Sequence, residues 1–104
     1  MTDERRRRPR LKIFCEIAFS RVDGDSIIRA ATENLSSDGF YCTSDEPFSP
    51  GDRLDCRISI PIGGLNSQAV ILDGRVRVLR VEVKGLEPGF GIACQFEERR
   101  VAVQ

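Results

Sequence analysis

The sequence predicts an all-β fold, a closed antiparallel barrel, preceded by a basic N-terminal arm. Three observations predict it. Apolar and polar residues alternate from Ile13 onward, which is the period of a strand with one buried face. Turn-forming residues interrupt this alternation at short, regular intervals. The first 12 residues lack any apolar pattern and carry six basic side chains, so we expect a flexible arm there.

Each strand is predicted from its own alternation. Apolar residues occupy every second position in residues 13–19, 54–60 and 90–96. Residues 68–84 form one long strand with a bulge at Val78-Leu79, where the apolar phase changes. A turn at Asp73-Gly74 would instead divide this segment into two strands. The tail, residues 97–104, has room for a helical turn or two.

The turns follow the strands closely. Segments rich in Gly, Pro, Asp and Ser lie at residues 23–25, 49–52, 61–64 and 85–89. Short strands separated in this way are typical of a closed antiparallel barrel. A chain of 104 residues suits one domain, which we divide into the arm, residues 1–12, and the barrel, residues 13–104.

Charge is unevenly distributed although the totals balance, with 16 basic and 16 acidic residues. The arm contains six basic residues and only two acidic ones, Asp3 and Glu4. The barrel therefore carries the compensating negative charge. This asymmetry indicates an anionic partner bound at the arm and argues against a surface that coats nucleic acid.

The composition argues against an enzyme and against a metal site. The chain has no His, no Ser-His-Asp or Cys-His set and no Gly-rich phosphate loop with its Lys. The four cysteines, Cys15, Cys42, Cys56 and Cys94, lack the close spacing of a zinc or redox motif. We interpret them as small buried apolar groups, with a disulfide framework as the alternative.

A predicted hairpin brings two polar motifs together, the arginine run at residues 5–10 and a second segment at residues 34–39. If Asp23-Gly24 is its two-residue turn, Ile13 lies opposite Asn34 and Arg10 opposite Ser37. If Gly24-Asp25 is the turn, Arg10 lies opposite Gly39. Either register places the arginine run beside the segment Asn34-Leu35-Ser36-Ser37-Asp38-Gly39.

These residue types suit an anionic nucleotide. The guanidinium fork of Arg makes paired hydrogen bonds to phosphate oxygens or to O6 and N7 of guanine, and it stacks on bases. Asn34 and Ser36 offer short polar side chains to a base edge or a ribose. Gly39 permits close approach of the backbone to a ligand, or a positive φ. Phe40 and Tyr41 follow, as candidates for stacking or for the core.

The two motifs resemble the signature of the PilZ domain family, an arginine stretch followed by a (Asp/Asn)-x-Ser-x-x-Gly stretch. They stand here as Arg5-Arg6-Arg7-Arg8-Pro9-Arg10 and as residues 34–39. Residues 89–96 resemble the closing strand of the family, and residues 49–52 its mid-barrel turn. The resemblance implies a six-stranded antiparallel β-barrel whose usual C-terminal helix is shortened in this chain.

The resemblance also implies a function. It implies a cytoplasmic receptor that binds cyclic di-GMP as a ligand, with no cofactor and no metal. The implied ligand-binding residues are Arg5, Arg6, Arg10, Asn34, Ser36 and Gly39. The implied protein partner is a regulatory, motility or polysaccharide-export protein, and we expect neither nucleic acid nor membrane insertion, since no apolar stretch is long enough to cross a bilayer.

Two other functions stay open from the residues alone. The first is a ligand-independent adaptor that docks other proteins through exposed strands of the same barrel. The second is a small barrel that binds single-stranded nucleic acid through the basic arm, which predicts a steep dependence on salt.

Overall fold

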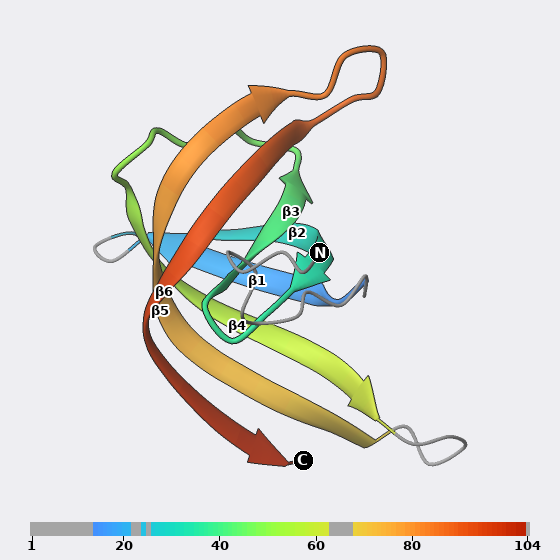
Figure 1. Cartoon of the computed structure of the whole chain (residues 1–104), viewed down its shortest axis with the longest axis vertical. Helices are drawn as coiled ribbons and strands as arrows, with labels where there is room; N and C mark the ends of the chain where they lie inside the picture. The colour runs from blue at the N-terminus through green and yellow to red at the C-terminus, as the bar shows by residue number, and fades with distance from the viewer. Residues whose placement is uncertain (1–13, 22–23, 25, 63–67, 104) are drawn as a thin grey trace, which may run out of the picture.

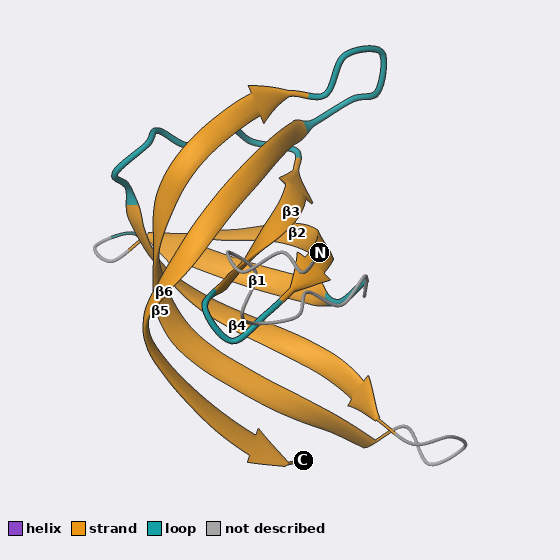
Figure 2. Cartoon of the chain, viewed as in Figure 1, coloured by secondary structure: helices purple, strands orange, loops and turns teal. Residues whose placement is uncertain are grey.

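The computed structural model describes residues 14–21, 24, 26–62 and 68–103, and all regular structure in these segments is β-strand (Figure 1, Figure 2). The strands are β1 (Glu16–Arg21), β2 (Ile27–Leu35), β3 (Gly39–Ser44), β4 (Arg53–Ile62), β5 (Gln68–Val83) and β6 (Phe90–Val103). They form a closed barrel in the order β1-β2-β3-β6-β5-β4. Every pairing between neighbouring strands is antiparallel. The predicted six-stranded antiparallel barrel is confirmed.

The barrel interior is filled by the apolar phase of each strand. Ile17 and Phe19 of β1 are almost fully buried, as are Leu54 and Ile58 of β4 and Ile92 of β6. The ring of Phe19 packs against two more aromatic rings, with centroid distances of 6.0 Å to Phe40 and 5.6 Å to Phe48. Burial of this apolar surface is the main source of the barrel's stability.

All four cysteines are buried and free, as predicted. Burial raises the pKa of the Cys15 thiol, and it is also the main reason why the pKa of Cys56 is raised to about 12. A hydrogen bond with Cys94, together with burial, raises the pKa of Cys42. Cys15, Cys42 and Cys56 are therefore protonated apolar groups of the core.

The first hairpin has the register predicted from a turn at Asp23-Gly24. Glu16 pairs with Ala31 and Ile17 with Ala30. The backbone N–H of Thr32 extends this register by donating to the carbonyl oxygen of Cys15 at 2.9 Å. Asp23 and Asp25 themselves lie outside the described residues.

The long strand predicted for residues 68–84 is present as β5, with no break at Asp73-Gly74. Its pairing with β6 shifts between Val78 and Arg80, so Leu79 is the extra residue of the predicted bulge. Gly74 instead allows close packing of β6, since a Cβ there would lie 2.5 Å from the carbonyl oxygen of Glu98.

The tail, which has room for a helical turn or two, instead continues β6 as a strand to Val103. The first half of β5 supplies the partner for this extension, with Val70 opposite Val103 and Leu72 opposite Val101. The β-branched valines also favour a strand. Figure 1 shows β6 running down to the C-terminus beside β5, which runs in the opposite direction.

Candidate functional site

The second motif connects β2 to β3 at the outer face of the barrel. Asn34 and Leu35 are the last residues of β2, and Gly39 is the first residue of β3. Leu35 packs against the core, so its neighbours on either side, Asn34 and Ser36, project outward because side chains alternate along a strand.

A β-bulge fixes the position of Asn34. The pairing of β2 with β3 shifts between Thr32 and Asn34, which leaves Glu33 as the extra residue. The Oδ1 atom of Asn34 is buried and has no hydrogen-bond partner, the one such side-chain atom in the described part of the chain. An unpaired buried oxygen costs about 1–3 kcal/mol, so this atom is suited to accept a hydrogen bond from a bound group.

Ser36 organises the loop. Its backbone N–H donates to the carbonyl oxygen of Gly39 at 2.9 Å, and its hydroxyl lies 3.3 Å from the same oxygen. The hydroxyl oxygen accepts a hydrogen bond from the N–H of Asp38 at 3.2 Å. The N–H of Phe96 donates to the carbonyl oxygen of Asp38 at 2.8 Å. The loop is therefore held against β6 before any ligand binds.

Gly39 is required by the packing of β3 against β6. A Cβ at this position would overlap the carbonyl oxygen of Cys94. The glycines with positive φ are Gly51, Gly85 and Gly89 among the described residues, so the positive-φ explanation for Gly39 is wrong. The close approach that we predicted for its backbone is made by a neighbouring strand, and its approach to a ligand stays a prediction.

Tyr41 covers the outer face beside Asn34, with which it pairs. Its side chain occupies the space that a Cβ on Gly91 would need. The Tyr41 hydroxyl donates to Glu82 at 2.9 Å, and the ammonium nitrogen of Lys84 lies 5.5 Å from the ring centroid. Phe40, by contrast, is buried in the core, which is the second of the two roles predicted for these aromatics.

Lys84 and Glu33 form a partly buried ion pair beside Tyr41. Lys84 donates to Glu33 at 2.7 Å, and the hydroxyl of Thr43 donates to the same carboxylate. These two hydrogen bonds, that from Lys84 first, hold the pKa of Glu33 below its usual value. They also tie the bulged residue of β2 to β3 and to the end of β5.

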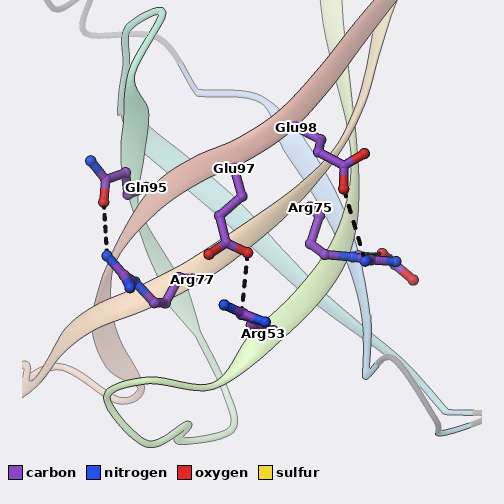
Figure 3. A network of polar contacts seen from close by, with 7 residues as sticks. Arg53, Arg75, Arg77, Gln95, Glu97 and Glu98 are labelled. Carbon is purple, nitrogen blue, oxygen red and sulfur yellow. Dashed lines mark hydrogen bonds and ion pairs between the residues drawn. The ribbon is translucent and has the colours of Figure 1, made fainter.

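A row of polar side chains extends from the motif across the outer face of β6, β5 and β4. Gly39 pairs with Gln95 of β6, Gln95 with Arg77 of β5, and Arg77 with Arg53 of β4. Figure 3 shows Gln95, Arg77 and Arg53 on these neighbouring strands, with Arg77 bound to Gln95 at 3.4 Å and Arg53 paired with Glu97 at 3.3 Å. The sequence alone does not indicate that Gln95 and Arg77 lie near Gly39, because only the strand register makes them neighbours.

The structure describes only half of the predicted binding set. Asn34, Ser36 and Gly39 lie together at the β2–β3 connection. Arg5, Arg6 and Arg10 lie outside the described residues, as does Ile13, so their predicted position opposite the motif stays a prediction. Within the described segments, no group of three or more Cys, Asp or Glu side chains could hold a metal ion. No helix there could span a membrane.

Comparison with known proteins identifies the family. The model of the PilZ domain matches residues 4–103, which include both motifs and the whole described barrel. The chain belongs to the PilZ domain family. PilZ domains are non-catalytic receptors for cyclic di-GMP, which they bind as a ligand and not as a cofactor.

A solved structure shares the fold. The chain is similar to the Bacillus subtilis inhibitor of motility (MotI/DgrA), with a TM-score of 0.78 and 16% sequence identity. The match covers 94% of this chain and 45% of that one, so the chain spans just under half the length of this structural neighbour. No curated protein matches the sequence.

Proposed function

We propose that this protein is a receptor for cyclic di-GMP in which Asn34, Ser36 and Gly39 hold the ligand on the outer face of the barrel and Arg5, Arg6 and Arg10 clasp it from the arm. The observation that carries the proposal is the unpaired, buried Oδ1 of Asn34. This acceptor sits at the end of β2, next to the strand from which the arm departs.

The chemistry of the ligand matches these groups. Cyclic di-GMP carries two phosphates, two ribose hydroxyls and two guanines. The guanidinium forks of the arm suit the phosphates and the acceptors O6 and N7 of guanine. The Asn34 oxygen suits a donor, such as a guanine N–H or a ribose hydroxyl. The register of β1 with β2, extended beyond Cys15 and Thr32, supports a path that leads the arm past Asn34.

Binding would act as a switch through the arm. A compact dianion held by several guanidinium groups would order the arm across the outer face. The ordered arm would create or cover a surface to which a partner protein binds. The cytosolic partner belongs to the regulatory, motility or polysaccharide-export classes. The motility inhibitor that shares this fold makes a motility component the first class to test.

Isothermal titration calorimetry of the full chain with cyclic di-GMP tests the proposal, with linear di-GMP and GTP as control ligands. Arg6→Ala and Arg10→Ala are each expected to weaken binding by about 1–3 kcal/mol, the range for a lost bidentate contact. Absence of binding by the wild type, or equal affinity in both variants and the wild type, would show that the proposal is wrong. Partner capture that is insensitive to cyclic di-GMP would favour the adaptor function instead.

A further inference from the structure

The outer face beside Gly39 continues onto two side chains that neither motif includes. Residues directly opposite each other in a sheet project from the same face, so Gln95 and Arg77 both follow Gly39 on the outside of the barrel. At the usual spacing of about 4.8 Å between strands, the backbone of Arg77 lies about 10 Å from that of Gly39. Gly39 itself adds no side chain to obstruct this surface.

Arg77 differs from the neighbouring arginines of β4 and β5 in its partner. Arg53, Arg75 and Arg80 each pair with a carboxylate, at 3.3 Å, 3.2 Å and 2.9 Å respectively. Arg77 contacts the amide oxygen of Gln95, and no carboxylate of the described segments lies within ion-pair distance of it. A guanidinium has five N–H donors, so most donors of Arg77 stay available for another acceptor.

The contact with Gln95 gives Arg77 a preferred direction. A neutral amide orients the guanidinium without neutralising its charge, in contrast to the carboxylates that hold Arg53 and Arg75. Arg77 also projects from the strand between Val76 and Val78, which are fully buried. The backbone that carries it is therefore fixed by the core, and its fork is presented to solvent beside the candidate site.

We propose that Arg77 is a further ligand-binding residue and that Gln95 positions it. This inference rests on the proposed function: the arm arginines meet the phosphates of cyclic di-GMP, and the Arg77 fork donates to O6 and N7 of one guanine. The planar fork of arginine matches these two acceptors. The barrel body thus contributes to recognition of the base and not only to the support of the arm.

The test compares Arg77→Ala with Arg29→Ala in the full chain by calorimetry. Arg29 is exposed on the outer face of β2, about 17 Å along the strand from Asn34, and its loss removes the same charge. Two ligands are used, cyclic di-GMP and its analogue with carbon in place of guanine N7. Arg77→Ala is expected to weaken cyclic di-GMP binding by about 5- to 150-fold, whereas Arg29→Ala leaves it nearly unchanged.

The analogue separates a base contact from a general effect of charge. The wild type and Arg29→Ala are expected to prefer cyclic di-GMP over the analogue, and Arg77→Ala is expected to show a smaller preference, because it loses the contact with one of the two guanines. Gln95→Glu would pair with Arg77, and it is expected to reduce both the affinity and the preference. Thermal unfolding should stay close to that of the wild type in all three variants, since these side chains are exposed.

The outcomes distinguish this inference from the proposed function. If the wild type binds cyclic di-GMP and Arg77→Ala binds as tightly as Arg29→Ala, the role of Arg77 is wrong while the receptor function stands. If Arg77→Ala weakens both ligands equally, the contact with guanine N7 is wrong. If the wild type binds neither ligand, the receptor function itself fails.

Discussion

Gly39 of β3 lies so close to Cys94 of β6 that the carbonyl oxygen of Cys94 occupies the position of a Cβ on Gly39. The glycine that ends the motif is therefore required by the packing of β3 against β6, whatever its contacts with a ligand. Because β6 in turn carries Gln95 directly opposite Gly39, the same close packing joins the motif to the polar surface of β6 and β5.

Gly39→Ala is expected to lower the free energy of unfolding by about 1–3 kcal/mol, since the new methyl group meets backbone that cannot move aside easily. Urea denaturation measures this change. Gly74→Ala is the matched control, because its Cβ would meet the carbonyl oxygen of Glu98 in a similar way at a distance from the motif. Both variants should be destabilised, but only Gly39→Ala should also weaken cyclic di-GMP binding under conditions where both stay folded.

Asn34→Ala is expected to separate stability from binding. The variant removes an oxygen that is buried without a partner, so the free energy of unfolding should be unchanged or higher, while ligand affinity falls. Ser36→Ala provides the contrast, because it removes the hydroxyl that accepts from Asp38 and should cost about 1 kcal/mol of stability. A loss of stability in Asn34→Ala as large as that in Ser36→Ala would contradict our description of the Asn34 oxygen.

The cysteines are expected to resist thiol reagents in the folded protein. Burial raises the pKa of Cys15, and it is the main cause of the value of about 12 for Cys56; the reactive thiolate is therefore scarce near neutral pH. Titration with a disulfide reagent at pH 8 should detect almost no thiol in native protein and all 4 cysteines after denaturation. Rapid reaction of one thiol in the native state would identify an open route into the core.

The Glu33–Lys84 ion pair should stabilise the barrel fully only above about pH 4.5, where Glu33 is ionised. The pKa of Glu33 is lowered in the folded protein from its usual 4.5, mainly by the hydrogen bond from Lys84. A lowered carboxyl pKa adds stability that is present above pH 4.5 and is lost as the pH falls through the folded value. Glu33→Gln should therefore be less stable than the wild type at pH 7, by about 1 kcal/mol or less, with the difference shrinking toward pH 3.

Urea denaturation between pH 7 and pH 3 measures this dependence. Lys84→Met removes the other partner and should show the same convergence with the wild type in acid. Glu16→Gln, on the exposed side of β1, removes a carboxylate that has no ion pair among the described residues and serves as the control. A constant difference between Glu33→Gln and the wild type across this range would show that the ion pair is not its cause.

Much of the barrel could be predicted from the sequence, because the pattern of buried residues has the period of a strand. The inward phase of β1 and β4 follows directly from the alternation of apolar residues around Ile17 and Ile58. The pairing register of β1 with β2 could be predicted from the two-residue turn at Asp23-Gly24. Three of the ligand-binding residues expected from the motif, Asn34, Ser36 and Gly39, do lie together, since six consecutive residues cannot be separated by folding.

Other features depended on which strand lies beside which. Whether the tail became a helix or a strand was decided by the length of β5, which offers Val70 and Leu72 as partners to the end of β6. The need for glycine at position 39 was decided by the carbonyl oxygen of Cys94, a residue far away in sequence. Side-chain periodicity is a local property that can be recognised along the chain. Gln95 and Arg77, by contrast, become neighbours of Gly39 only when β3, β6 and β5 pair in the closed barrel.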